Sequence, residues 1–197
     1  GFSPLTQINR DNVAKLQMGW VWELPPSTNQ ITPLVHDGIM FIASNGRLQA
    51  FNVVTGDLLW QYARSGTFGM LRNLGIYGEN IYFAAETDMV ALNMRTGAVV
   101  WEKQIIPTGY GLRLSAGPLI AKGVVTQGAA YCIGLFPGGC FIVGLDAATG
   151  KELWRFNTIA RPGQPGGESW NHAPVDGRLG GGVWIAGSYD PELDLLY

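Results

Sequence analysis

A ten-residue phrase that occurs three times constrains the fold more than any other feature of this sequence. It reads FNVVTGDLLW at 51–60, LNMRTGAVVW at 92–101 and LDAATGKELW at 145–154. Each copy contains a Thr-Gly pair and ends in a tryptophan, and successive tryptophans are 41 and 53 residues apart. A self-similar period of roughly 20–50 residues is the signature of repeat architectures. One insertion before the third copy, which holds two cysteines, accounts for most of the unequal spacing.

Each repeat reads as four short strands separated by turns. In the first repeat, HDG, NG and TG are turn-forming sequences that divide the segments TPLVHD, GIMFIAS, RLQAFNVV and GDLLWQY. Four antiparallel strands that recur about every 45 residues are typical of β-propeller blades. The predicted fold class is therefore all-β, a propeller of four-stranded antiparallel blades with tryptophan-docking motifs.

The sequence predicts a single partial propeller domain over 1–197. Its blades are expected at about 28–62, 72–103 and 114–156, with an incomplete blade at 180–197. The sequence predicts three further elements: an outer strand of a neighbouring blade at 18–24, a short helix or irregular arm at 7–17, and a hairpin turn in DPELD at 190–194.

The recurring phrase has a physical role in such a blade. Its Thr-Gly pair suits a tight turn between the third and fourth strands, because glycine accepts a positive φ at little cost. The preceding polar residue can hydrogen-bond local backbone and cap the turn; it is Asn52, Asn93 or Asp146. The tryptophan then lies on the outer strand, where its ring can be buried between adjacent blades. Deleting one such ring should cost about 3–5 kcal/mol.

Three blades and part of a fourth cannot close a ring. Closure removes the exposed edges of the sheets, and an open arc would leave two. The sequence begins GFSPL and ends DLLY inside an apolar run, so we expect both ends to be cuts. The remaining propeller blades are therefore among the expected partners of this segment.

Composition excludes several classes of protein. The 197 residues are 47% hydrophobic and 14% charged, which provides a packed core and argues against disorder. The formal net charge is −2, so there is no basic excess to hold a nucleic-acid backbone. The longest apolar runs are too short to span a bilayer.

The only two cysteines, Cys132 and Cys140, bracket the Gly/Pro-rich stretch IGLFPGG. A loop of this kind can bring the two thiols together, and a disulfide would indicate an oxidising compartment. Two reduced thiols in a loop are the alternative, and the residues alone leave both open.

The longer motifs resemble those of the pyrroloquinoline quinone (PQQ)-dependent alcohol dehydrogenases. VGLDAATGKELW matches the docking phrase A-x-D-x-x-T-G-x-x-x-W of quinoprotein propellers, with Gly144 in place of Ala. The resemblance extends over nearly the whole chain and is carried by FSPLTQINRDNVAKLQMGWVW, TPLVHDGIMF, GKELWRFNTIARPGQPGGESW and GGGVWIAGSYDPELDLLY. These segments are similar in sequence to the N-terminal portion of the family's proteins, and they follow one another in the same order.

This resemblance implies an eight-bladed propeller with PQQ in a central funnel. In the family a Ca²⁺ or lanthanide ion polarises the quinone, an Asp base assists hydride removal from an alcohol, and electrons leave to cytochrome c or a quinone. A periplasmic or extracytoplasmic location is implied with it. The base and the remaining metal ligand would lie beyond Tyr197, so no catalytic residue is expected within this chain.

The resemblance also implies cofactor contacts. Arg72, in RNLGIY, corresponds to an Arg that contacts the quinone, and Ser115, in LSAGP, to a hydroxyl residue that contacts a PQQ carboxylate. Trp184, in GGGVW, corresponds to the tryptophan floor beneath the PQQ ring, and Gln30, in NQITP, to a polar contact. The plain structural alternatives are a surface Arg, a turn Ser and a core Trp.

Three departures from the family leave the catalytic set incomplete, and one of them puts metal binding in question. FGML, at 68–71, replaces the adjacent cysteines that form a lid over the cofactor. Ala130, in TQGAAY, stands where the family has its first metal ligand, a Glu, and a methyl group cannot ligate a hard cation. GGGVW also lacks the hydroxyl residue expected before the tryptophan. Two functions follow as hypotheses: a PQQ-dependent oxidoreductase, or a non-catalytic PQQ-like propeller that acts as a binding or assembly scaffold.

Overall fold

Three four-stranded antiparallel sheets form the body of the computed structural model, which describes residues 5–26, 30–44, 46–64, 72–132 and 139–197. The first sheet contains β1 (Leu34–His36), β2 (Ile39–Ser44), β3 (Arg47–Asn52) and β4 (Leu58–Ala63). The second contains β5 (Gly75–Tyr77), β6 (Asn80–Ala85), β7 (Asp88–Asn93) and β8 (Val99–Gln104). The third contains β9 (Leu119–Ala121), β10 (Val124–Gly128), β11 (Phe141–Asp146) and β12 (Glu152–Asn157).

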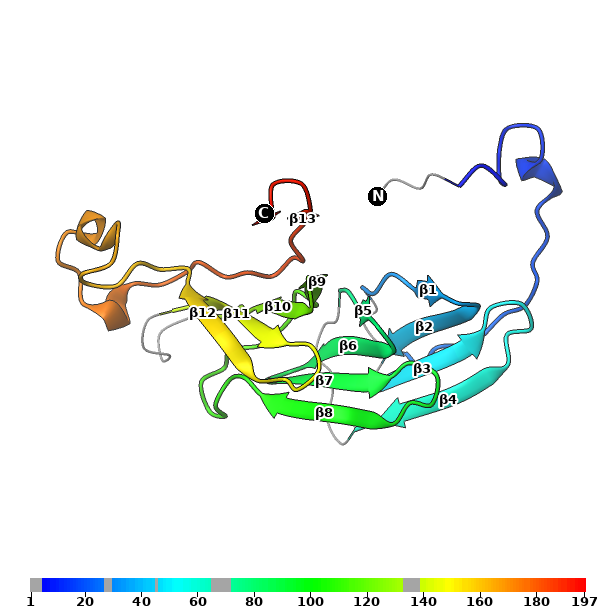
Figure 1. Cartoon of the computed structure of the whole chain (residues 1–197), viewed down its shortest axis with the longest axis horizontal. Coiled ribbons are helices and arrows are strands. Elements are labelled where there is room, and N and C mark those ends of the chain that lie inside the picture. Colours follow the sequence, from blue (N-terminus) through cyan, green and yellow to red (C-terminus); the bar gives the residue numbers. More distant parts are fainter. Residues whose placement is uncertain (1–4, 27–29, 45, 65–71, 133–138) are drawn as a thin grey trace.

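The three sheets stand side by side in an arc (Figure 1). In each sheet the strands pair in chain order, and β5 contacts β9 of the next sheet. The first strands β1, β5 and β9 gather on the inner side of the arc, and β4, β8 and β12 lie on its outer side (Figure 1). This arrangement confirms the predicted fold class of four-stranded antiparallel propeller blades.

The hydrophobic core is densest around the second sheet. Strands β6 and β7 are buried at nearly every position, whereas every residue of β12 but the last is exposed. A strand that is covered on both faces reads as a continuous apolar run, as IYFAA and MVAL do. The second sheet has a neighbour on each face, which explains why it supplies much of the core.

Tryptophans join the successive blades by hydrogen bonds to backbone. In three places an indole Nε1–H donates to a carbonyl in the Thr-Gly turn of the next sheet: Trp20 to Val53 (3.1 Å), Trp60 to Met94 (3.0 Å) and Trp101 to Ala147 (2.9 Å). Each ring lies directly over the glycine of that turn, namely Gly56, Gly97 or Gly150. The docking role predicted for the repeated tryptophans is confirmed for Trp60 and Trp101.

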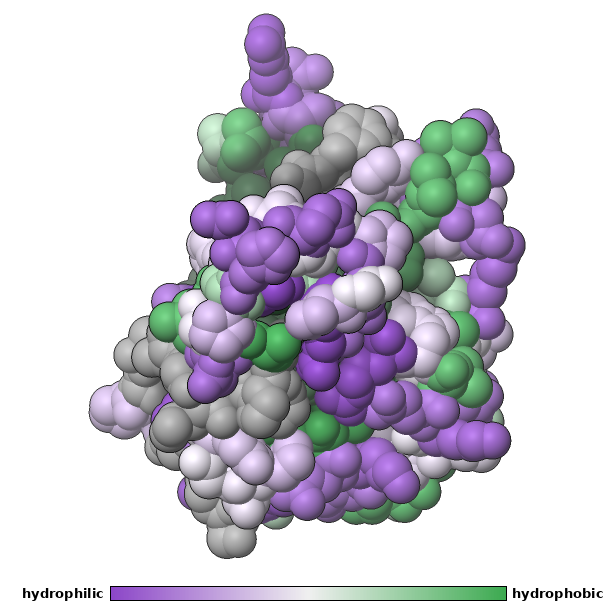
Figure 2. Space-filling model, turned by 90° about the vertical axis from the view of Figure 1, so that its left-hand side faces the viewer, coloured by the Kyte–Doolittle hydropathy of each residue, from purple (hydrophilic) through white to green (hydrophobic). Residues whose placement is uncertain are grey.

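The segments before and after the sheets have little regular structure. A 3₁₀ turn, η1 (Val13–Lys15), lies in the N-terminal arm. Residues 18–24, expected as an outer strand, are not part of a sheet because no described strand pairs with them, although Trp20 still docks. After β12 the chain forms two further 3₁₀ turns, η2 (Gly167–Trp170) and η3 (Val175–Gly177). Figure 2 views the side on which this excursion lies; it is mostly polar, with separate hydrophobic patches.

The chain then forms a small hairpin from β13 (Tyr189–Asp190) and β14 (Leu195–Leu196). The Asp190 carboxylate accepts hydrogen bonds from the backbone N–H groups of Glu192 and Leu193, at 2.9 and 3.0 Å. This bonding confirms the hairpin turn predicted in DPELD.

Candidate functional site

Three residues from distant parts of the sequence meet beside the third sheet. Arg72 lies just before β5, Ser115 in the connection between β8 and β9, and Trp184 in the chain that follows η3. The Arg72 Nη1 donates to the Ser115 carbonyl oxygen (3.3 Å), and the guanidinium carbon lies 5.3 Å from the centre of the Trp184 ring. We call Arg72, Ser115 and Trp184 the RSW cluster. They are three of the four residues that the family resemblance singled out as cofactor contacts.

The backbone around Ser115 is held by its neighbours. The Leu114 N–H donates to the Glu86 carbonyl (2.7 Å), and Arg113 and Ala130 exchange two backbone hydrogen bonds in an isolated bridge. Ser115 is only 3% exposed, and its hydroxyl has no hydrogen-bond partner among the described residues. A buried hydroxyl without a partner is costly, so this oxygen is suited to a ligand group or a water that would satisfy it.

Trp184 is the exposed member of the cluster. The residue is 57% exposed, so part of its indole is free to stack on a flat ligand. The excursion that precedes it is closed by Arg178, which is 3% exposed and donates to the carbonyls of Ala160 (2.5 Å) and Ala173 (3.0 Å). The same guanidinium lies 5.6 Å from the Trp170 ring.

Other candidate residues fall outside the RSW cluster. Gln30 is exposed, and its role as a cofactor contact stays a prediction. The segment FGML, where the family has its lid cysteines, lies entirely outside the described residues.

The sequence analysis did not single out Thr126 and Gln127 in β10. Both are buried, and Thr126 Oγ1 and Gln127 Oε1 have no hydrogen-bond partner among the described residues. The sequence does mark these two residues, because the polar pair TQ interrupts the apolar run VVTQGAA.

Cys132 and Cys140 form a disulfide, with Cα atoms 5.3 Å apart. Of the two alternatives that the residues left open, the structure therefore contains the bonded pair. Cys140 is fully buried and Cys132 is 6% exposed, so the bond lies inside the molecule. It joins the chain just after Ala130 to the residue that precedes β11.

Comparison with known proteins places the chain among quinoproteins. A family profile described as "Outer membrane protein assembly factor BamB" matches residues 18–141, which is more than half of the chain. The quinohemoprotein alcohol dehydrogenase ADH IIB of Pseudomonas putida is 31% identical over 224 residues, covering 100% of this chain and 31% of the relative. The chain belongs to the family that this profile describes, and over its whole length it is similar to the PQQ-dependent alcohol dehydrogenase family.

Further family members match over the same extent. The dehydrogenase subunit of the alcohol dehydrogenase (quinone) of Gluconacetobacter polyoxogenes is 33% identical and is covered over 31% of its length. The solved quinohemoprotein alcohol dehydrogenase ADHIIG of Pseudomonas putida HK5 superposes with a TM-score of 0.84 at 25% identity, covering 99% of this chain and 32% of that one. The chain thus spans about a third of the length of these family members.

The RSW cluster fits the cofactor of this family in its chemistry. PQQ is planar and anionic, and the cluster offers an exposed indole face, a guanidinium and a buried hydroxyl without a partner. Arg72 can form charge-assisted hydrogen bonds with quinone oxygens or carboxylates, and these are stronger than neutral ones. The Ser115 hydroxyl has the donor and acceptor capacity that a carboxylate group would use.

The described residues do not fit the family's metal. Ala130 is 3% exposed and presents a methyl group at the position where the sequence resemblance implies a carboxylate ligand. Within the described ranges no group of three or more His, Cys, Asp or Glu side chains lies close enough to hold a metal ion. In the same ranges, no helix has the length and apolarity needed to cross a membrane.

Proposed function

We propose that this chain is part of a PQQ-dependent oxidoreductase that oxidises alcohols or related compounds by hydride transfer to PQQ. The observation that carries the proposal is the RSW cluster. Arg72, Ser115 and Trp184 are separated by 43 and 69 residues in sequence, yet they meet in space through a hydrogen bond and a cation–π contact. Family membership supplies the context, and the activity itself is our inference.

Each residue of the cluster would have a distinct task. The Trp184 indole would support one face of the ring system, because its exposed π surface favours stacking. The Arg72 guanidinium would neutralise negative charge that develops on the quinone oxygens during reduction. The buried Ser115 hydroxyl would orient a carboxylate. PQQ, when bound, would supply the hydride acceptor that the protein's own side chains lack.

The wider setting of this activity is also proposed. The disulfide is consistent with a periplasmic or other extracytoplasmic location, since such bonds persist in oxidising compartments. The reduced enzyme would pass its electrons to an acceptor such as cytochrome c or a quinone. The base that assists hydride removal would come from residues outside this chain.

PQQ titration of the complete protein tests the cluster, with quenching of tryptophan fluorescence as the readout. The titration is run in EDTA, in Ca²⁺ and in a lanthanide, and is followed by dye reduction with a primary alcohol. We expect Trp184→Ala, Arg72→Met and Ser115→Ala each to weaken binding by about tenfold or more, as expected for loss of a stacking or charged contact.

Matched control variants come from the same chain. Trp154→Ala removes another exposed tryptophan, and Arg155→Met removes an arginine that lies over the Phe141 ring, 3.9 Å from its centre. Both should bind PQQ as the wild type does. The absence of PQQ binding under every metal condition would contradict the enzyme, and equal binding by Trp184→Ala would contradict the site.

A non-catalytic PQQ-like propeller is the second candidate, and Ala130 favours it. A buried methyl group at the ligand position, with no acidic cluster in the described ranges, is what a propeller that has lost its metal would present. Such a protein would act as a binding or assembly scaffold. Failure of the complete protein to bind PQQ, with its fold intact by circular dichroism, would favour this candidate.

A further inference from the structure

The residues that carry Trp184 form a strap, Gly181–Trp184, that has no regular secondary structure of its own. It is tied to the third sheet at two points. The Thr158 hydroxyl lies 2.7 Å from the Gly181 carbonyl oxygen and can donate to it, and the Val183 N–H donates to the Ala129 carbonyl (2.9 Å). The position of Trp184 therefore depends on what lies beneath the strap.

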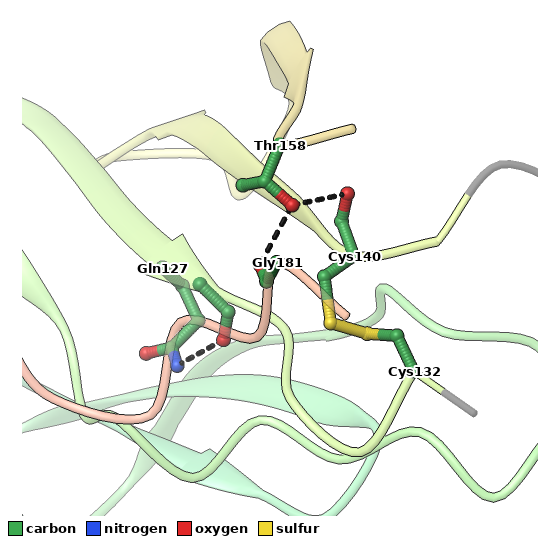
Figure 3. Close-up of a disulfide and its surroundings, with 6 residues drawn as sticks. Gln127, Cys132, Cys140, Thr158 and Gly181 are labelled. Atoms are coloured by element: carbon green, nitrogen blue, oxygen red, sulfur yellow. Dashed lines mark hydrogen bonds between the residues drawn. A yellow bond between two sulfur atoms is a disulfide. The ribbon is translucent and has the colours of Figure 1, made fainter. Parts of the chain in front are cut away.

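The Cys132–Cys140 disulfide is part of that support. A Cβ on Gly182 would lie 3.8 Å from the Cys140 Sγ and 3.8 Å from the Ala130 Cα, which is ordinary contact distance. Figure 3 shows Gly181 beside Cys140 and Thr158, with the bonded sulfurs next to the strap. The strap thus passes close to the disulfide and to the chain that follows β10.

The anchor of the strap is itself fixed to one of the cysteines. The Thr158 N–H donates to the Cys140 carbonyl (3.0 Å), and its hydroxyl lies 3.0 Å from the same oxygen (Figure 3). Cys140 therefore lies beside the strap and also fixes Thr158, the residue whose hydroxyl binds the strap. Contact is so close that a Cβ on Gly128 would lie 2.3 Å from the Val183 Cγ1.

We propose that the Cys132–Cys140 disulfide is a positioning element for Trp184 and, through it, for the planar anionic ligand of the RSW cluster. Breaking the bond would loosen Gly181–Trp184 and separate the indole from Arg72. The third sheet would stay folded, because Cys132 and Cys140 lie outside β10 and β11 and those strands keep their own ladder. The part of this proposal that concerns the ligand rests on the proposed function.

Hydrogen exchange of the complete protein tests the positioning role without any cofactor. The bond is removed in a Cys132→Ser/Cys140→Ser double variant, and separately by a phosphine in the wild type. The phosphine takes oxygen from water to become its oxide, while the S–S bond breaks and each sulfur gains a proton. Peptides that contain the Val183 amide should exchange at least tenfold faster, while peptides from β1–β8 should be unchanged.

Controls separate this bond from any other effect of the reductant. Phosphine should change nothing further at Val183 in the double variant. A Thr158→Val variant, which keeps the disulfide but loses the hydroxyl, should also accelerate exchange at the strap. Unchanged exchange in the double variant would overturn the proposal; if that variant does not fold, unchanged exchange in phosphine-treated wild type, with the two free thiols confirmed by mass, would overturn it.

PQQ titration of the same samples tests the ligand part. We expect the double variant to bind PQQ five- to tenfold more weakly than the wild type, at a temperature where circular dichroism shows that its sheets are still folded. Equal affinity in the presence of faster exchange would contradict a role in ligand positioning. A wild type that binds no PQQ would contradict the proposed function, and the exchange data would still decide whether the disulfide positions Trp184.

Discussion

Trp101 and Trp154 occupy the same place in two copies of one phrase, yet their surroundings differ. Trp101 is 9% exposed, donates to the Ala147 carbonyl at 2.9 Å and lies over Gly150 of the next sheet. Trp154 is 38% exposed, and its indole has no hydrogen-bond partner in the described part of the chain. It lies over its own sheet, where a Cβ on Gly144 would be 2.2 Å from the ring.

The difference shows that a tryptophan docks where an adjacent sheet receives its indole, and that its place in the repeated ten-residue phrase is not sufficient. Both tryptophans pair with a small residue across the ladder, Ala91 opposite Trp101 and Gly144 opposite Trp154, and the register shifts directly after each pair. The second sheet, like the first, has a following Thr-Gly turn to receive its indole, and the third has none among the described residues. The third sheet instead borders a cavity of about 720 Å³ between it and the C-terminal segment, lined by Trp154, Phe156 and Ile185 among others.

The largest expected effect comes from removing the docked ring. In this chain Trp101→Ala should lower the free energy of unfolding by about 3–5 kcal/mol, because it empties a buried site and removes one of the two hydrogen bonds to the Ala147 carbonyl, leaving that from the Tyr82 hydroxyl. Trp154→Ala should cost about 1 kcal/mol, because little of its burial depends on a neighbouring sheet. Urea denaturation followed by circular dichroism measures both. Equal losses would break the comparison, and a longer form with a following sheet should raise the cost of Trp154→Ala.

The glycine beneath the docked ring gives the next effect in size. Gly150 has a φ of 68°, and an added Cβ would lie 2.8 Å from the Trp101 ring. Gly150→Ala should therefore cost about 2–3 kcal/mol, from backbone strain plus displacement of the indole. Gly38→Ala is the matched control, since its φ is 73° and nothing lies within 4 Å. The control should show the strain alone, about 1 kcal/mol.

Docking and strand order were predictable because their signals are local. A Thr-Gly turn and the tryptophan that ends each phrase determine where a strand reverses and which side chain reaches the next blade. Residues 18–24 stay a prediction, because they were expected to be the outer strand of a neighbouring blade and a strand forms only where another lies within hydrogen-bonding reach.

The candidate site was less accessible to such reasoning. Arg72, Ser115 and Trp184 were singled out by family resemblance, since no periodic pattern connects three single residues in separate loops. Arg178 and Thr158 were missed because they act on backbone carbonyls, at Ala160 and Gly181, and such partners leave no trace in sequence. The open disulfide question was settled only by the Cα separation that the surrounding strands impose.

A charged contact between blades should give a smaller effect than either docking variant. Arg64, at the end of the first sheet, reaches Asp88 (2.5 Å) and Glu102 (2.8 Å) of the second. Arg64→Met should cost about 1–2 kcal/mol, because Asp88 is buried and would lose its cation. Arg155→Met, in the open third sheet, breaks a partly exposed pair with Glu152 and a cation–π contact with Phe141, and should cost about 0.5–1 kcal/mol. Chemical denaturation ranks the two, and a larger loss for Arg155→Met would contradict the ranking.

The smallest expected effect is a difference in the pH dependence of stability between the third Thr-Gly turn and the first two. Asn52 and Asn93 cap the first two turns, whereas Asp146 caps the third and accepts from the N–H and hydroxyl of Thr149 (2.8 and 2.7 Å). The hydrogen bonds from the Thr149 hydroxyl and N–H hold the pKa of Asp146 below its ordinary value. A lowered folded-state pKa means that this stabilisation is complete above the unfolded pKa, about 3.9, and is lost as the pH falls through the folded value. Asp146→Asn should therefore reduce the loss of stability between pH 5 and pH 2 and leave neutral stability nearly unchanged. Thermal midpoints across that range measure it, with Asp57→Asn as the control, and an unaltered acid profile in Asp146→Asn would show that the third turn behaves like the other two.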